Sequence, residues 1–460
     1  MLPPGPRLPA ALQLANWIVR PLPFLDRCRA RFGDVFTLDV LGFGRWVVLA
    51  SPQAIREVFT GDPHVLHAGE ANWILGPVVG AHSVLLLDGA PHARQRRLLL
   101  PPFHGERMHA YASVMREETE REVDAWPFGE PFRLHPRLQS ITLNVILRAV
   151  FGIQDEATHA RVHDDIVRLL DTFETPITFF PFLHRDLGPL TPWRTFRARL
   201  DAVDREIYAE IARARAGPPE ALERRTDVAA LLLRARDEEG RPMTDVELRD
   251  ELMTLLAAGH ETTATSLAWA FDQILAHPAA LARIEAELDA LTGGGERPLG
   301  PGELARLEYL DAAIKESLRR RPIFPIVVRR LATEATVAGH ALRAGTIVAP
   351  CIHLAQRRPD IYPDPDAFRP ERFLGVKPDP FAWLPFGGGD RRCIGMAFAL
   401  YEMKVVIATV LGRARLELAG SPSRVGRRGI SIAPAGGVRV VLERRLARPG
   451  APASTAALAR

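Results

Sequence analysis

One stretch, residues 386–395, constrains this chain more than any other: a glycine-rich loop that carries a single cysteine and runs directly into an apolar helical pattern. A thiolate that binds iron needs a loop with little bulk near the sulfur, backbone N–H groups turned toward its charge, and an apolar wall against water. The glycines at 387–389 meet the first two needs, and Phe386 can form the wall. Gly395 would let the next helix pass close to a flat macrocycle. A structural cysteine in an ordinary turn is the competing interpretation, and the order and spacing favour a haem-iron site at Cys393.

This stretch resembles the cysteine-loop signature of the cytochrome P-450 family of haem-thiolate monooxygenases. The matching positions are Phe386, Gly389, Arg391, Cys393 and Gly395. The resemblance implies that Cys393 is the axial ligand of the iron of haem b, that Phe386, Arg391 and Gly395 contact the haem, and that O2 is the co-substrate. It also implies a mainly α fold with a smaller β-rich region, in which the haem lies between the cysteine loop and a long central helix.

Length and composition bound the remaining possibilities. Of the 460 residues, 47% are hydrophobic and 25% are charged, as in an ordinary globular protein. The net charge of +4 comes without basic runs or interleaved aromatic residues, so nucleic acid is a weak inference and docking of an acidic protein partner fits equally well. Cys28, Cys351 and Cys393 lie far apart, which excludes a disulfide framework and paired zinc ligands and makes a reducing cytoplasm the default.

The two ends of the chain carry expectations of their own. The apolar residues 8–19 are broken by a proline and are too short to span a membrane, which takes about 20 apolar residues. Residues 2–6 resemble the proline-rich hinge that follows the anchor of membrane-bound family members, so we expect either a soluble member of the bacterial type or a truncated chain. We expect residues 1–445 to form a single domain and residues 446–460 to be a disordered tail.

The N-terminal part predicts a small sheet followed by a long loop. Residues 35–41 and 45–50 are typical of strands, and residues 61–89 lack clear periodicity. Long ordered loops are often functional, and in the resembling family this one covers the substrate pocket. A loop that packs its own apolar side chains on the surface is equally favoured. The pocket candidates are Trp73, Ile74, Val78 and Val84.

A basic helix is predicted to begin at His92 and to end before Pro101. His92 and Arg96 lie one turn apart on the same face and can both hold haem propionates, and their spacing is similar to that of the family's haem-contacting helix. Alone, the pattern would be better explained by an exposed basic face. Arg94 and Arg97 fall on other faces and could meet an electron donor.

Residues 111–216 have a mostly helical pattern with proline-rich breaks at 127–136 and 176–192. The second break resembles the lid over the family's pocket, which makes Phe180 a pocket candidate, while core packing is an equally good explanation. The aromatic residues of this region are Phe173, Phe179, Phe180 and Phe182.

A long helix is predicted to start at a capping box formed by Thr244 and Glu247 and to run until His277. At about 1.5 Å per residue it would span roughly 50 Å. Its middle, residues 257–263, contains a glycine that costs about 1 kcal/mol relative to alanine and two β-branched threonines. Something other than helix propensity therefore selects this sequence.

Glu261 and Thr262 match the acid and alcohol that lie over the iron in the resembling family, where the helix opens locally to leave a groove for oxygen. A hydroxyl backed by a carboxylate can relay the two protons that O2 activation needs, so the resemblance gives this pair a catalytic role. Ala258, one turn earlier, is a pocket candidate. The alternative is a threonine that bonds back to its own helix and a glutamate in a surface ion pair.

Further scaffold and pocket residues follow along the chain. Glu316 and Arg319 lie three apart on a helix, and with Arg372 they resemble the family's buried Glu-Arg-Arg cluster beneath the haem. Arg329, which follows the helix where a strand is expected over 326–330, is a further propionate candidate. The remaining pocket candidates are Ile323, Phe324, Val327 and, in the last predicted hairpin, Ile430, for which burial in an ordinary edge hairpin is equally favoured.

The combined prediction is a monooxygenase that inserts one oxygen atom from O2 into a hydrophobic small molecule of the fatty acid, terpenoid or steroid type, by hydroxylation or epoxidation. A peroxide-using haem-thiolate enzyme and a non-enzymatic haem sensor are the alternatives. No flavin or iron–sulfur segment is present, so we expect electrons from a separate ferredoxin or flavodoxin with its reductase. We expect neither nucleic acid nor a membrane anchor. Candidates for the docking face are Arg357, Arg358, Arg391 and Arg392, most of which solvated surface explains equally well.

Overall fold

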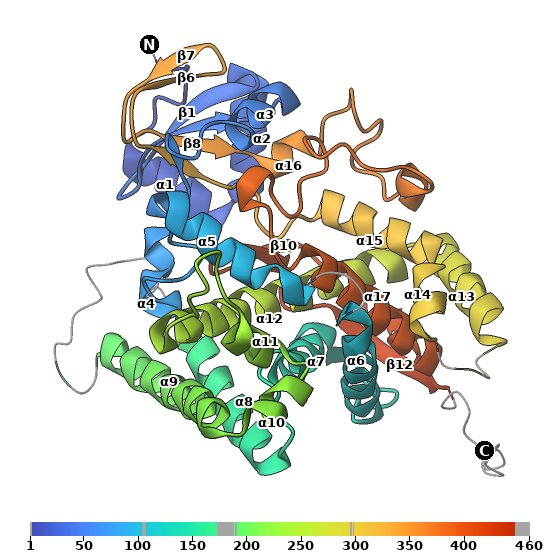
Figure 1. The fold of residues 1–460 in the computed structure, drawn as a ribbon. Coiled ribbons are helices and arrows are strands. Elements are labelled where there is room, and N and C mark those ends of the chain that lie inside the picture. The colour runs from blue at the N-terminus through green and yellow to red at the C-terminus, as the bar shows by residue number, and fades with distance from the viewer. Residues whose placement is uncertain are drawn as a thin grey trace, which may run out of the picture.

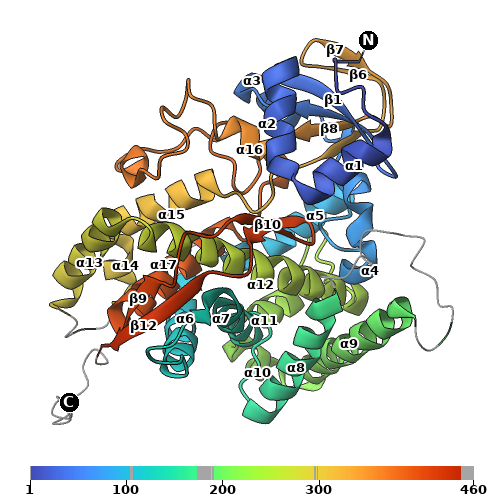
Figure 2. The same ribbon diagram turned by 180° about the vertical axis from the view of Figure 1, so that it is seen from behind.

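The computed structural model describes residues 2–103, 107–172, 188, 191–294, 297 and 299–446. Figures 1 and 2 show the ribbon from opposite sides: helices make up most of it, one group of strands lies near the N-terminus, and β9 and β12 lie toward the C-terminal end. This arrangement agrees with the expected mainly α fold with a smaller β-rich region. Nearly all of the predicted tail lies outside the described residues, as do the lid phenylalanines Phe173, Phe179, Phe180 and Phe182.

The main sheet of the β-rich region has the strand order β1-β2-β8-β5-β3. Its strands are β1 (Val35–Val40), β2 (Gly44–Leu49), β3 (Leu66–His67), β5 (Arg329–Leu331) and β8 (Ile347–Pro350). Strands β1 and β2 form an antiparallel hairpin, and β8 adds to β2 in parallel, with Val47 opposite Val348. Because β2 and β8 are far apart in the sequence, this sheet joins the N-terminal region to the segment that leads to the cysteine loop.

Three helices cover the main sheet: α1 (Ala10–Val19), α2 (Pro21–Phe32) and α3 (Pro52–Phe59). Helix α3 is capped at its N-terminus by Ser51, whose hydroxyl accepts the N–H of Ala54 at 3.3 Å. Ile55 of α3 is buried against Val47, while Leu25 of α2 is buried with Phe36 of β1. The sheet is therefore held by apolar burial on both faces.

The helical body surrounds α12 (Asp245–Leu275), which crosses the centre of the molecule in both views (Figures 1 and 2). The other long helices are α5 (Gly89–Leu99), α6 (Arg107–Asp124), α7 (Leu134–Ala149), α8 (Glu156–Thr172), α9 (Pro192–Ala216), α13 (Pro278–Thr292), α15 (Glu308–Arg320) and α17 (Met396–Arg413). The shorter helical segments are η1 (Glu70–Leu75), α4 (Gly76–Val79), η2 (Pro101–Phe103), α10 (Pro219–Arg224), α11 (Val228–Arg234), α14 (Pro301–Ala305), α16 (Ile352–Ala355), η5 (Pro370–Phe373) and η6 (Gly389–Arg391). The remaining strands are β4 (Phe132–Arg133), β6 (Ala335–Val337), β7 (His340–Leu342), β9 (Ala414–Leu418), β10 (Val425–Arg428), β11 (Ser431–Pro434) and β12 (Arg439–Arg445).

Helix α12 confirms the predicted start and explains part of its unusual middle. The hydroxyl of Thr244 accepts the N–H of Glu247, and the carboxylate of Glu247 accepts the N–H of Thr244, so both halves of the capping box are present. A Cβ at Gly259 would lie 3.1 Å from Cδ1 of Ile146 on α7, which packs along this part of α12. The glycine therefore permits close packing of two helices.

Some element predictions were wrong or incomplete. Helix α2 was not anticipated, and the long loop at 61–89 contains the short segments β3, η1 and α4. The strand expected over 326–330 begins only at Arg329, where pairing with Val348 of β8 starts. Strands β3 and β5 both depend on partners distant in the sequence, because β3 pairs with β5 and β5 pairs with β8.

Candidate active site

The cysteine loop packs tightly against the end of α3. A Cβ at Gly388 would lie 2.2 Å from Cδ2 of Phe59, and one at Gly389 would lie 2.1 Å from the carbonyl oxygen of Phe59. Gly389 also has a φ of 68°, which disfavours any residue with a side chain. The N–H of Cys393 donates to the carbonyl of Phe386 at 3.0 Å, which closes the loop. These contacts fix the backbone that carries the sulfur.

The Cys393 side chain is exposed, yet burial raises the pKa of its thiol, which the N–H of Gly395 and the charge of Arg96 partly oppose. The side chain is thus accessible and yet surrounded by protein, as expected for a residue that lines an interior space. Phe386 and Ile394 pack against the main core beside it, so the surroundings are apolar. This environment fits a thiolate that binds a flat, apolar cofactor.

Four basic side chains gather beside the cysteine loop: His92 and Arg96 of α5, Arg329 of β5, and Arg391. Burial and the charge of Arg391 lower the pKa of His92 to about 4, so its imidazole is neutral at pH 7. Burial likewise lowers the pKa of Arg329 to about 10. Among the described residues, neither Arg96 nor Arg329 has an ion-pair partner, and the guanidinium of Arg329 donates only to the carbonyl of Val328 at 2.9 Å. Buried positive charge without a carboxylate fits the two propionates of haem.

Arg391 differs from the other three, because the protein itself occupies much of its guanidinium. It donates to the carbonyls of Val84 (3.2 Å) and Leu87 (2.6 Å) and pairs with Asp88 at 2.5 Å. Asp88 in turn accepts the N–H groups of Gly69 and Glu70 at 2.9 Å each. The structure thus gives Arg391 a role in holding the loop at 84–88 that the sequence did not indicate.

Between its exposed first turn and its last residue, α12 has open side chains only near its middle. Residues 248–254 and 263–274 are all buried, whereas Ala258 is exposed and Thr262 is half-buried. Residues four apart share a helical face, so both side chains border the same space. Ala258 thus remains a pocket candidate.

The expected local opening of α12 is not seen, because the helix is continuous through residues 257–263. The hydroxyl of Thr262 donates to the carbonyl of Ala258 at 2.5 Å, and that of Ser266 donates to the carbonyl of Thr262 at 2.8 Å. The bond back to the helix, which was the competing interpretation of Thr262, is therefore present. Such bonds weaken and bend helices without breaking them.

Glu261 lies in a half-buried polar network that includes an ion pair with Arg428. Its carboxylate accepts from Gln139 of α7 (2.7 Å) and from Thr265 (3.1 Å), and lies 3.7 Å from Nε2 of His135 and 3.4 Å from Nε of Arg428. Burial lowers the pKa of His135 to about 4. Sequence reasoning missed these partners, since they lie on α7 and β10 and belong to no local motif.

The predicted ion cluster is assembled and buried. Arg319 and Glu316 are both 0% exposed and form two hydrogen bonds of 2.6 and 2.9 Å, and Arg372 lies 3.4 Å from Glu316. Arg319 also donates to the carbonyls of Gln356 (2.8 Å) and Pro365 (2.9 Å). The cluster therefore joins α15 to the segment that precedes the cysteine loop.

The apolar pocket candidates fall into two groups. Val78, Val84 and Ile323 are buried within hydrophobic clusters, so their side chains serve the core in this structure. Ile323 packs with Leu22 of α2, an element the sequence did not predict. The other candidates are half-buried or exposed, namely Trp73, Ile74, Phe324, Val327 and Ile430.

Two of the pocket candidates are exposed large side chains. Ile430 is 44% exposed in the turn of the β10–β11 hairpin, so it is not buried as an ordinary edge-hairpin residue would be. Trp73 is exposed and its ring lies 6.2 Å from that of Phe43 in the β1–β2 turn. It therefore sits beside the N-terminal sheet.

Most of the arginines predicted for partner docking are already ion-paired. Arg358 pairs with Asp34 (2.5 Å) and Asp360 (2.9 Å), and Arg357 pairs with Asp366. The helical arginines behave in the same way. Arg94 binds Asp237 and Glu247, and Arg97 lies 3.4 Å from Glu238. Arg392 is exposed and has no ion pair with a described residue.

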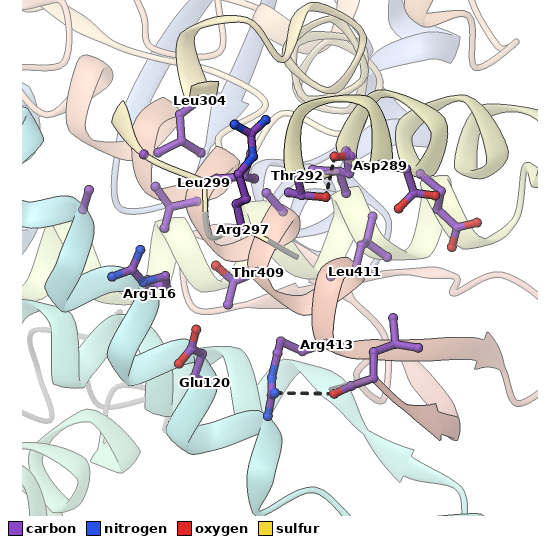
Figure 3. Close-up of a pocket in the computed structure, with 18 of the residues that line it drawn as sticks. Arg116, Glu120, Asp289, Thr292, Arg297, Leu299, Leu304, Thr409, Leu411 and Arg413 are labelled. Carbon is purple, nitrogen blue, oxygen red and sulfur yellow. Dashed lines mark hydrogen bonds between the residues drawn. The ribbon is translucent and has the colours of Figure 1, made fainter. Parts of the chain in front are cut away.

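A separate cavity of about 530 Å³ lies between α6, α13, α14 and the end of α17 (Figure 3). None of the predicted site residues lines it. Two of its arginines are neutralised by the protein, Arg413 by Asp124 at 2.6 Å and Arg415 by Glu285 at 3.0 Å. This cavity is distinct from the space beside Cys393.

Comparison with known proteins decides the family. The sequence profile described as Cytochrome P450 matches residues 2–432. The chain belongs to the cytochrome P450 family. Its fold is accordingly the P450 fold, with the haem between the long central helix and the cysteine loop.

The relatives and solved structures agree. The chain is 43% identical over 415 residues to "Putative cytochrome P450 135B1" of Mycobacterium bovis, covering 90% of this chain and 85% of the relative. It is 41% identical over 456 residues to "Putative cytochrome P450 138" of Mycobacterium tuberculosis, covering 96% and 97%. The structure described as "Retinoic acid bound cyanobacterial CYP120A1" superposes with a TM-score of 0.84 at 24% sequence identity. The superposition covers 97% of this chain and 100% of that chain.

Family membership carries the general chemistry. The protein is a P450 monooxygenase that uses haem b and O2, takes electrons from redox partners and acts on hydrophobic substrates. Within the part of the chain that the structure describes, no helix is both long and apolar enough to cross a membrane.

Proposed function

We propose that Cys393 is the axial thiolate ligand of the haem and that the space between Cys393 and the middle of α12 is the active site. The observation that carries the proposal is that Cys393 and the middle of α12 both have accessible side chains within otherwise buried surroundings. The Cys393 side chain is exposed although nearby protein raises the pKa of its thiol. On α12, Ala258 is exposed and Thr262 is half-buried, whereas residues 248–254 and 263–274 are buried. When bound, haem supplies the iron at which O2 is activated and one oxygen atom is inserted into the substrate. Phe386 and Gly395 would keep bulk and water away from the sulfur.

The basic side chains beside the loop would hold the haem propionates. Arg96 and Arg329 offer charge that no described carboxylate neutralises, and neutral His92 offers an N–H donor. Arg391 would add its charge from a position fixed by the loop at 84–88. The buried cluster of Glu316, Arg319 and Arg372 would hold the loop's supporting segment in place.

Glu261 and Thr262 would manage protons on the distal side. Thr262 presents its hydroxyl at the open part of α12, where it can donate to an oxygen once it leaves the Ala258 carbonyl. The Glu261 side chain is 23% exposed, so it can take up a proton from solvent and pass it inward, while Gln139 and Thr265 hold its carboxylate in place.

The substrate we propose is an uncharged or amphipathic hydrophobic molecule of the fatty acid, terpenoid or steroid type. The apolar candidates Ala258, Phe324, Val327 and Ile430 support it, since each is at least partly open. The proposed electron donor is a ferredoxin or flavodoxin with its reductase, and Arg392 is the docking candidate that remains after the ion pairs are counted among the described residues. The cytoplasm is the proposed compartment, in line with free thiols at all three cysteines.

The decisive test is the absorption spectrum of the dithionite-reduced protein with carbon monoxide, compared between the parent and Cys393→Ala. Cys351→Ala is the matched control, because that buried thiol lies in the β-rich core. We expect a strongly red-shifted Soret band in the parent and in Cys351→Ala and its loss in Cys393→Ala. An unchanged band in Cys393→Ala would refute the assignment of the ligand.

A further inference from the structure

The peptide groups of Val84 connect two elements that are distant in the sequence. The N–H of Val84 donates to Oε1 of Glu251 on α12 at 2.9 Å. The carbonyl of the same residue accepts from Nη1 of Arg391 in the cysteine loop at 3.2 Å. One residue of the segment 82–88 is thus bound on one side by the central helix and on the other by the loop that carries Cys393.

Further contacts extend this attachment along the segment. On the α12 side, Asp250 accepts the N–H of His82 at 2.9 Å, and the hydroxyl of Thr254 donates to that of Ser83 at 2.7 Å. The approach is close, because a Cβ at Gly80 would lie 2.0 Å from Oδ1 of Asp250. On the other side, Arg391 holds Leu87 and Asp88 as described above. The segment 82–88 is therefore hydrogen-bonded on one side to α12 and on the other to Arg391 of the cysteine loop.

Glu251 is unusual among these contacts because it is a fully buried carboxyl group. Glu251 is 0% exposed, and its second carboxylate oxygen, Oε2, has no hydrogen-bond partner in the part of the chain that the structure describes. Burial raises the pKa of its carboxyl group to about 8, opposed by the Val84 N–H and assisted by Asp250 and Glu247. At pH 7 the group therefore carries a proton.

The charged groups around Glu251 give an ionised carboxylate little support. Its own helix contributes the carboxylates of Glu247 and Asp250, and the segment contributes His82. Two arginines that contact its neighbours are engaged with other carboxylates: Arg249 with Asp204 and Asp250, and Arg94 of α5 with Asp237 and Glu247. Among the described residues no cation pairs with Glu251 itself, so the neutral carboxyl group is favoured over the carboxylate.

We propose that Glu251, in its protonated form, is a positioning residue of this monooxygenase that fixes the segment 82–88 between α12 and Arg391, and that loss of its proton releases the segment. The proposal rests on the proposed function for the place of Arg391 beside the haem and of the segment over the pocket. Ionised Glu251 has only the Val84 N–H to stabilise it and lies beside two carboxylates. Opening of the segment would let water reach the carboxylate.

Hydrogen exchange tests the proposal on the haem-loaded protein. Protection of the peptide that contains residues 82–88 is measured by mass spectrometry at pH 7 and pH 9, corrected for the intrinsic exchange rate, in the parent, Glu251→Gln and Glu402→Gln. Glutamine keeps an acceptor for Val84 and cannot ionise. Glu402 is the matched control, since it is a buried carboxyl group on α17 whose pKa is raised by burial alone.

We expect protection in the parent to fall about tenfold from pH 7 to pH 9, because about one group in ten is still protonated one unit above its pKa. Glu402→Gln should follow the parent, and Glu251→Gln should show no fall. Glu251→Leu, which removes the acceptor, should lack the protection at both pH values. Equal pH dependence in the parent and Glu251→Gln, or no fall in the parent, would overturn the proposal. These results do not depend on which cysteine binds iron, so the carbon monoxide spectrum remains an independent test of the proposed function.

Discussion

Replacing Arg319 by methionine should destabilise the protein more than any exposed charge substitution. Methionine keeps the length and apolar stem of arginine and removes its guanidinium. That guanidinium makes two hydrogen bonds to Glu316 and one each to the carbonyls of Gln356 and Pro365, all between 2.6 and 2.9 Å. Its removal leaves a carboxylate that is 0% exposed next to two unsatisfied carbonyls.

The expected loss in the free energy of unfolding is about 4 kcal/mol. Breaking a buried ion pair by removing one partner costs about 3 to 5 kcal/mol. Glu316 keeps Arg372 at 3.4 Å and the N–H of Arg369 at 3.0 Å, which holds the value below the upper end. Since proteins are stable by about 5 to 15 kcal/mol in total, the variant should lose a large fraction of its stability.

Urea unfolding followed by tryptophan fluorescence measures this loss, and the Soret band followed in parallel reports haem retention. Arg283→Met is the control, because Arg283 pairs with Glu371 at 3.3 Å, both side chains are 53% exposed, and such pairs contribute about 0 to 1 kcal/mol. An Arg319→Met variant no less stable than Arg283→Met would refute the view that burial makes this cluster important.

Three further predictions address the loop, the pH dependence and the proton path. Gly389→Ala should lose at least about 2 kcal/mol more than Gly387→Ala in urea unfolding: both have positive φ, but only at 389 would the Cβ meet the Phe59 carbonyl. Because the pKa of Glu251 rises from 4.5 to about 8 on folding, the native state holds its proton more tightly than the unfolded chain. The stabilisation of the folded state by protonated Glu251 is complete below pH 4.5 and is lost as the pH rises through 8, a change of up to about 5 kcal/mol. Because glutamine does not titrate, the urea midpoint should fall less between pH 6 and 9 in Glu251→Gln than in the parent. Thr262→Val should raise hydrogen peroxide release at the expense of oxygenated product, while Thr262→Ser should resemble the parent, and unchanged coupling in Thr262→Val would contradict the relay.

Features carried by local spacing were predictable from the sequence. The capping box of α12 needs only Thr244 and Glu247 at the right distance, and the structure shows both of its hydrogen bonds. The pair of Glu316 and Arg319 likewise follows from helical periodicity. Helical periodicity did not predict that this pair is buried. That expectation came from the resemblance of Glu316, Arg319 and Arg372 to the family's buried cluster.

Features that depend on distant partners were not predictable. Gly259 suggested a functional opening of the helix, whereas its place is set by Ile146 on a helix more than 100 residues earlier. Arg358 was a docking candidate by its charge alone, and Asp34, from the opposite end of the chain, neutralises it. Glu251 escaped notice because nothing in its neighbourhood along the chain shows that it is buried without a cation.

The arginines of this protein also show that a positive charge alone does not indicate an anion-binding site. A desolvated arginine without a carboxylate partner is a better indication. Arg94, Arg319 and Arg358 each meet carboxylates of the chain, which repay the cost of leaving water. Arg96 and Arg329 are desolvated enough to lower their pKa values and meet no described carboxylate. Arg96 and Arg329 thus place positive charge beside the open cysteine, where an anionic group would neutralise it. Haem, with two propionates, should therefore stabilise the folded chain through charge as well as through apolar burial.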